Sequence, residues 1–227
     1  MKKAILILTL IISLFSCQEK KEDVKKKELT ESIKTELIDE LKKMDRADQL
    51  NRSYISLGTF DQKLIDSTKN LSMSDYFKFK KSHKKEISKK QIDSLWNIQN
   101  EIDLKNTNRL YELTKEYGWL SQTKLDSVID PMIFLFHTPK QTIEKMQSLL
   151  FEEVQAKRMN PNKFAMYVDN MRIKAYGKSQ LYGTGDEFDP KTNSVVSPFI
   201  ENIDSTNIER KKIGLPELKE GEYRIKK

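Results

Sequence analysis

The stretch SKKQIDSLWNIQNEIDLKNTNRLYELTKEYG, residues 88–118, decides the fold class of this chain. Ser88 and Gln91 have the spacing of a capping box, in which two side chains satisfy free backbone N–H groups at the start of a helix. Apolar residues then recur at helical spacing up to Tyr117 and Gly118, which stop the pattern. They are Ile92, Leu95, Trp96, Ile102, Leu110 and Leu113. The sequence therefore predicts one long helix that ends at about Glu116.

A second helix is predicted upstream, from about Leu29 to Tyr54, with Gly58 as its end. It carries its own apolar stripe, made of Ile33, Leu37, Ile38, Leu41, Met44 and Leu50. Between the two helices, in residues 59–88, the pattern weakens and predicts an irregular insertion with room for one short helix. His83 lies in a run of lysines there, and we expect it to be exposed to solvent.

Downstream, residues 128–136 form the most apolar segment of the chain after residue 16, and we expect them to form the centre of the core. Pro131 either opens or kinks a helix in this segment. Thr138, Pro139 and Gln141 have the order of an N-cap, a first-turn proline and a capping-box glutamine, which predicts a helix to about residue 157. Asn160 and Pro161 again supply an N-cap and a first-turn proline, which predicts a helix that ends at Gly177.

The period changes after Gly177. Residues 179–184 and 194–199 are short extended candidates on either side of a turn-rich segment, which predicts a β-hairpin. Residues 205–212 have the pattern of a last helix. The expected fold is thus mainly α: a single helical domain of about five or six helices with a small C-terminal β-hairpin.

The N-terminus has the plan of a bacterial lipoprotein signal. Lys2 and Lys3 precede the apolar run 4–15, which is too short to cross a bilayer stably, and Ser16 stands before Cys17. We therefore expect a signal peptide at 1–16, a lipidated Cys17 with a charged flexible tether at 17–28, and the folded domain at 29–227. The expected location is the bacterial cell envelope, periplasmic or surface-facing, with the membrane as a partner through the lipid on Cys17.

Composition excludes several kinds of function. Cys17 is the only cysteine, so the domain has neither a disulfide framework nor a thiolate metal site. Charged residues make up 33% of the chain and both signs are interspersed, which is typical of a solvated surface, and we expect no nucleic-acid partner. The seven glycines form no phosphate-binding loop or dinucleotide fingerprint. No cofactor is identified.

Several polar residues are candidates for a site. Asp48 and Arg52 lie four residues apart and share a helix face, with Gln49 beside them, and an exposed ion pair is the simpler interpretation of the two. On the long helix, polar residues recur beside the apolar stripe, and a solvated face is the simpler interpretation of this set, Gln99, Asp103, Asn106 and Arg109. His137 follows the apolar segment and could be a general base, a metal ligand or a structural histidine. No metal site is predicted, because His83 is the only other histidine.

In their order and spacing, the polar fragments resemble a family of uncharacterised exported bacterial proteins that share a domain of unknown function. The matching fragments are Asp48-Gln49 with Arg52, Tyr117-Gly118-Trp119, His137, Gln141, Asp169, Gln180-Leu181-Tyr182-Gly183-Thr184 and Ile213-Gly214-Leu215-Pro216. The resemblance covers residues 40–218. The family has no known reaction or cofactor, but the resemblance implies that these fragments belong to one shared site.

Three hypotheses follow. The first is a membrane-anchored lipoprotein that binds a small polar ligand or an envelope protein in one cleft, collecting Asp48, Arg52, Asp103, His137, Asp169 and Gln180, with Gln49, Arg172 and Tyr182 as further candidates. The second is a hydrolase in which His137 or a carboxylate activates water, while Arg52 or Arg172 holds an anionic substrate. The third is a structural component of the envelope. Whether the chain is an enzyme stays open.

Overall fold

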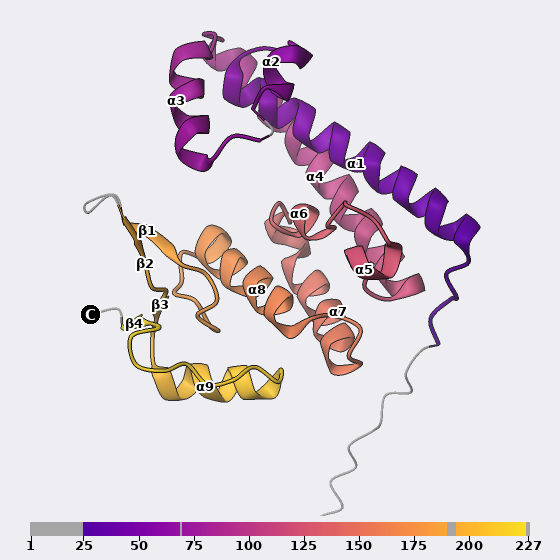
Figure 1. Ribbon diagram of the computed structural model, residues 1–227, viewed down its shortest axis with the longest axis vertical. Helices are drawn as coiled ribbons and strands as arrows, with labels where there is room; N and C mark the ends of the chain where they lie inside the picture. Colours follow the sequence, from indigo (N-terminus) through magenta and orange to yellow (C-terminus); the bar gives the residue numbers. More distant parts are fainter. Residues whose placement is uncertain (1–24, 69, 190–193, 226–227) are drawn as a thin grey trace, which may run out of the picture.

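The computed structural model describes residues 25–68, 70–189 and 194–225, which form a mainly helical fold (Figure 1). The predicted signal peptide, Cys17 and most of the predicted tether lie outside the described residues. Within the described part of the chain, no helix is both long enough and apolar enough to cross a membrane.

Two long antiparallel helices, α1 (Glu31–Leu57) and α4 (Lys89–Tyr117), organise the molecule (Figure 1). Thr30 caps the start of α1, and Gly58 ends it with a positive φ of 68°, a conformation that glycine adopts without strain. Both bonds of the predicted capping box between Ser88 and Gln91 are present at the start of α4. The two long helices that the sequence predicts are therefore confirmed.

The insertion between α1 and α4 is more regular than predicted. It contains two helices, α2 (Gln62–Asp66) and α3 (Met73–His83), rather than one. The reason is local capping: the side chains of Asp61 and Ser72 each accept a hydrogen bond from a backbone N–H of the first turn. His83 is exposed, as predicted, and its ring stacks on Phe79.

The helical elements downstream of α4 are α5 (Gln122–Leu125), α6 (Met132–Leu135), the 3-10 helix η1 (Lys140–Thr142), α7 (Ile143–Gln155), α8 (Pro161–Tyr176) and α9 (Ile203–Lys212). Of these, α6, η1 and α7 pack against α4, and α8 packs against α6 and α7 on the side away from α4 (Figure 1). The predicted cap at Thr138 is wrong, because its hydroxyl donates to the carbonyl of Leu135 and α7 begins only at Ile143. Asn160 caps α8, and Gly177 ends it, both as predicted.

A hairpin is present, but it begins later than predicted. Strand β1 (Glu187–Asp189) pairs antiparallel with β2 (Ser194–Val196). Strands β3 (Phe199–Ile200) and β4 (Arg224–Ile225) pair in parallel. Residues 179–184 form no strand, because several of their backbone N–H groups bind a side chain of α8 instead, as described below.

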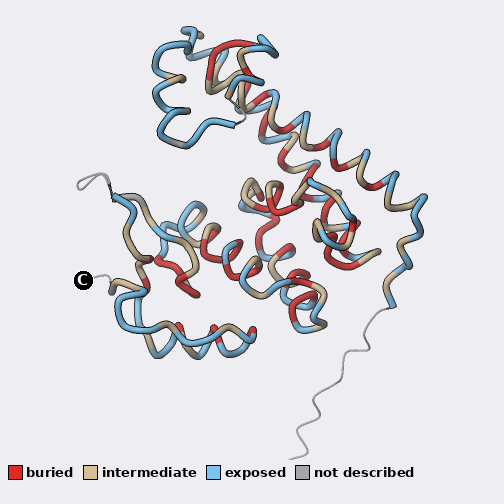
Figure 2. Tube along the Cα trace, in the orientation of Figure 1, coloured by how far each residue is buried: buried red, intermediate tan, exposed pale blue. Residues whose placement is uncertain are grey.

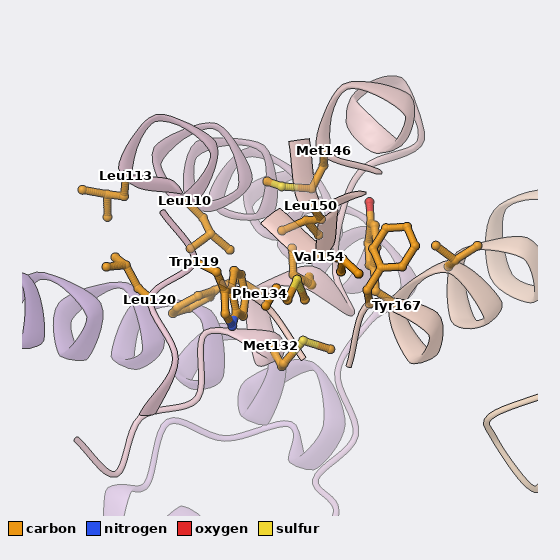
Figure 3. Close-up of a cluster of buried hydrophobic side chains, with 14 of the residues drawn as sticks. Leu110, Leu113, Trp119, Leu120, Met132, Phe134, Met146, Leu150, Val154 and Tyr167 are labelled. Atoms are coloured by element: carbon orange, nitrogen blue, oxygen red, sulfur yellow. The ribbon is translucent and has the colours of Figure 1, made fainter. Parts of the chain in front are cut away.

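The hydrophobic core lies where α4, α6, α7 and α8 meet, and it extends to the first half of α1 (Figure 3). Trp119, Phe134 and Tyr167 are among its largest fully buried side chains. Within the predicted central segment 128–136, Phe134 is buried, but Val128 is 90% exposed. Every member of this core lies between Leu29 and Leu215. A chain that starts at residue 18 therefore contains the whole packed unit.

The predicted tether ends earlier than Glu28. The Lys26 ammonium donates to the carbonyl of Lys115 over 3.1 Å, and the backbone N–H of Lys27 donates to the carbonyl of Glu116 over 2.9 Å. Both carbonyls belong to the last turn of α4, where free carbonyl groups and the helix dipole attract positive charge. Residues 26 and 27 thus belong to the folded domain.

Candidate functional site

Polar side chains replace apolar ones in the middle of the α1–α4 interface. On α1 the buried series Leu37, Leu41 and Met44 continues at helical spacing with Asp48 and Asn51. On α4 the buried series is Leu95, Gln99, Asp103, Asn106, Leu110 and Leu113. The predicted solvated face was therefore wrong for Gln99, Asp103 and Asn106, which are buried. The predicted apolar members Leu50 and Trp96 are instead 37% and 44% exposed.

Arg52 joins the two helices at this polar centre. Its Nε donates to Oδ1 of Asp48 over 3.1 Å, and its Nη2 donates to both carboxylate oxygens of Asp103 over 2.6 and 2.8 Å. Arg52 is 21% exposed in its side chain, whereas Asp48 is 1% and Asp103 10% exposed. The guanidinium is thus held by one carboxylate from its own helix and one from α4.

Gln99 donates hydrogen bonds to the same two carboxylates. Its Nε2 donates to Oδ1 of Asp48 over 3.0 Å and to Oδ1 of Asp103 over 2.7 Å. The Gln99 carbonyl oxygen in turn accepts from Nδ2 of Asn51 over 3.0 Å. The two buried carboxylates therefore have amide donors in addition to the guanidinium, as buried charges require.

His137 approaches the cluster from the loop after α6. Its Nδ1 lies 3.4 Å from Oδ2 of Asp48, and the same oxygen accepts a 2.7 Å hydrogen bond from Nε2 of Gln49. Nδ1 is buried and finds no hydrogen-bond partner among the described residues, although the His137 side chain as a whole is 23% exposed. The imidazole therefore turns its Nδ1 edge toward the buried carboxylate of Asp48.

The two carboxylates differ in their titration. Burial alone would raise the pKa of Asp48, but the neighbouring His137 ring and Arg52 guanidinium outweigh it, so this pKa lies below its ordinary value. Burial raises the pKa of Asp103, and the contacts with Gln99 and Arg52 only partly offset this effect. As the pH falls, Asp48 therefore keeps its negative charge longer than Asp103 does.

A groove of about 1080 Å³ lies beside the cluster, between α1, the α2–α3 insertion and α6. Arg52 and Gln49 line it together with Lys42, Asp45, Arg46, Leu50, Ser53, Ser56, Gln62, Ile65, Asp66, Thr68, Tyr76 and Ile133. Tyr76 of α3 is fixed to α1 by a 2.6 Å hydrogen bond with the hydroxyl of Ser56. Arg52 therefore belongs both to the buried cluster and to the wall of an open groove.

The cluster also has the donor set of a cation site. Asp48, Asp103 and His137 each offer one ligand atom, and these atoms lie within 4.8 Å of one another. Carboxylate and imidazole ligands suit several divalent metals. However, the guanidinium of Arg52 already bonds to both carboxylates, so a metal ion would have to displace it. The arrangement favours Arg52 as the resident cation.

Asp169 and Gln180 do not join this cluster, which corrects the prediction of one six-residue cleft. The Asp169 carboxylate accepts hydrogen bonds from the N–H groups of Leu181, Tyr182 and Thr184 and from the Thr184 hydroxyl. Gln180 bonds to both backbone groups of Gly185. These bonds close the loop after α8 and account for the missing strand in residues 179–184.

Arg172 and Tyr182 also have structural contacts. Nε of Arg172 donates to the carbonyl of Ser179 over 2.9 Å. Tyr182 is 4% exposed, and its carbonyl accepts a 2.6 Å hydrogen bond from Arg210 of α9. We therefore assign Asp169, Arg172, Gln180 and Tyr182 to a C-terminal support, separate from the groove, that fixes the loop and α9 onto α8.

Asn51 was not predicted as a member of the site, and Gln99 was predicted to lie on a solvated face. The signal was present in the spacing, because residues 41, 44, 48 and 51 and residues 95, 99, 103 and 106 continue the buried helical stripes. Polar residues at buried stripe positions of two neighbouring helices must pair with one another to avoid a large desolvation cost. Arg109, by contrast, is exposed and bonds to Glu40.

Comparison of the chain with protein-family models, with curated proteins and with solved structures found no match. The site is therefore interpreted from its own geometry.

Proposed function

We propose that this chain is a bacterial envelope lipoprotein, anchored through lipid on Cys17, whose helical domain binds a small anionic ligand in the Arg52 groove. The clustering of partly buried polar residues favours a binding role over a purely structural one in the envelope. The plan of residues 1–17 supports the location, and the ligand is left open.

The observation that carries the binding proposal is the fixed position of Arg52 in the groove wall. Its described contacts use Nε and Nη2, and within the described residues nothing binds Nη1. A guanidinium held by two carboxylates loses little further freedom when it binds a third anion, and its planar donors suit carboxylates and phosphates. Arg52 is thus prepared to receive an anionic group.

The charge around the groove supports an anionic ligand. The groove lining has three cationic side chains, Lys42, Arg46 and Arg52, and two carboxylates, Asp45 and Asp66, a formal excess of one positive charge. The hydroxyl groups of Ser53 and Thr68 offer further hydrogen bonds. A small molecule with a carboxylate or phosphate and several hydroxyl groups fits this lining.

The test is a thermal-shift screen of the unlipidated chain from residue 18 onward. The panel contains sugar acids, sugar phosphates, nucleotides and short peptides, each with an uncharged counterpart. A ligand at a hundred times its dissociation constant should raise the melting temperature by about 5–10 °C, because it binds only the folded state. Arg52→Lys and Arg46→Gln should reduce this shift. Arg109→Gln is the matched control, since Arg109 also joins α4 to α1 but lies outside the groove.

If both groove variants keep the full shift, or if Arg109→Gln loses as much of it as they do, the ligand binds elsewhere.

A second function, acid–base hydrolysis, is favoured by the approach of His137 Nδ1 to Asp48, which leaves Nε2 for a substrate proton. If wild type converts a ligand of the panel and His137→Gln binds it without converting it, the domain is a hydrolase rather than a binding protein.

A further inference from the structure

A second charged surface lies at α3 and the loop that follows it. Residues 78–90, KFKKSHKKEISKK, contain seven lysines and one glutamate, a formal net charge of +6 with neutral histidine. The whole chain carries +7. Almost all of the net positive charge of the protein is therefore gathered in thirteen residues of the insertion. We call residues 77–90 the lysine surface.

The lysines of this surface are free to meet a partner. Lys81, Lys84, Lys85, Lys89 and Lys90 are exposed, and most of α3 and the loop after it has the pale blue of exposed residues (Figure 2). Within the described residues no carboxylate pairs with any of these five, whereas Lys78 lies 3.3 Å from Asp75. Ion pairs within the described residues therefore do not explain why so many lysines lie together on this surface.

An apolar side chain stands among these charges. Phe77 is 60% exposed, although Tyr76 beside it turns inward to the hydroxyl of Ser56. Lys81 follows Phe77 by four residues on α3, so the two side chains share a helix face. Exposed aromatic groups flanked by lysines are typical of helices that lie in the interface of an anionic lipid bilayer.

We propose that the lysine surface binds the anionic lipid headgroups of a membrane, with Phe77 inserted between them. This goes beyond the ligand groove and rests on the proposed anchor only for the presence of a nearby membrane. The chain enters α1 at one end of the α1–α4 pair and α3 lies at the other end (Figure 1). Anchor and lysine surface can both touch one bilayer when this pair lies along it.

The test is co-sedimentation of the unlipidated chain from residue 18 with vesicles of phosphatidylcholine, with or without phosphatidylglycerol. We expect binding only to the anionic vesicles, and weaker binding at high salt. Replacing Lys81, Lys84, Lys85 and Lys89 by Gln should weaken binding by about a hundredfold, because each exposed lysine contributes to headgroup attraction. Phe77→Ser should weaken it about tenfold, since the inserted ring is lost.

The matched control replaces four exposed lysines elsewhere, Lys43, Lys105, Lys178 and Lys211, by Gln, which gives the same net charge. It should bind almost as wild type does. Equal loss in the control, no binding to anionic vesicles, or equally tight binding to soluble polyglutamate with no effect of Phe77→Ser would each overturn the proposal. Because the chain carries no lipid and the groove is untouched, these results are independent of the anchor and of the ligand.

Discussion

At the scale of single residues, the molecule places similar ion pairs in opposite environments. Asp48 is buried and has four polar neighbours, including Arg52 and Gln99. Glu40 binds Arg109 through two hydrogen bonds, but both partners are well exposed, at 35% and 43% of their side chains. Burial decides the energetic weight of a charge pair, because removal of one buried partner leaves the other without compensation.

Asp48→Asn should therefore lower the free energy of unfolding by about 3 kcal/mol. The equivalent change Glu40→Gln should cost less than about 1 kcal/mol, since water screens the exposed pair. Urea denaturation of both variants measures the difference. Equal costs for the two substitutions would show that the buried cluster contributes no more to stability than a surface ion pair.

At the scale of elements, the end of α4 depends on one buried carboxylate of α7. Glu153 is fully buried and accepts hydrogen bonds from the N–H of Trp119 and from the guanidinium of Arg158. Lys26 lies 3.2 Å away. Burial alone would raise the pKa of Glu153, but these cationic and N–H partners outweigh it and hold the pKa below its ordinary value.

Glu153→Gln should lower stability by about 2 kcal/mol at neutral pH, because hydrogen bonds to a charged group are lost. A carboxylate with a lowered folded-state pKa stabilises the fold above its unfolded-state pKa, and this contribution disappears as pH falls through the folded-state pKa. The difference between wild type and variant should therefore shrink in acid. Thermal unfolding between pH 7 and pH 3 tests this. A gap that stays constant or widens in acid would contradict it.

The sequence predicted elements better than it predicted the site, for a physical reason. Caps such as Ser88 with Gln91 act within one turn, so local residues determine where a helix starts. Which polar groups meet depends on how helices pack. Asp48, Asp103 and His137 converge because α1, α4 and the loop after α6 come together. Asp169 was predicted to lie in the same cleft, but its carboxylate accepts hydrogen bonds from the backbone N–H groups of the loop after α8 instead.

At the scale of the whole molecule, the lipid proposed on Cys17 should decide where the protein resides. Cys17→Ser removes the thiol to which this proposed lipid would attach and leaves the folded domain intact, because the core and the residues packed against it begin at Leu29. We expect radiolabelled palmitate to be absent from this variant. We also expect wild type, and not the variant, to partition into the detergent phase after solubilisation. Equal labelling of both proteins would contradict lipidation at Cys17.

The contact of Lys26 with the end of α4 also sets how far the domain can travel. Nine residue steps separate Cys17 from Lys26, a contour of at most about 30 Å. Five further steps to Glu31 add at most about 17 Å. The 21 helical steps along α1 from Glu31 to Arg52 add about 32 Å. An anchored molecule would therefore hold its groove within about 80 Å of the bilayer. Any ligand must diffuse into that region or be released within it.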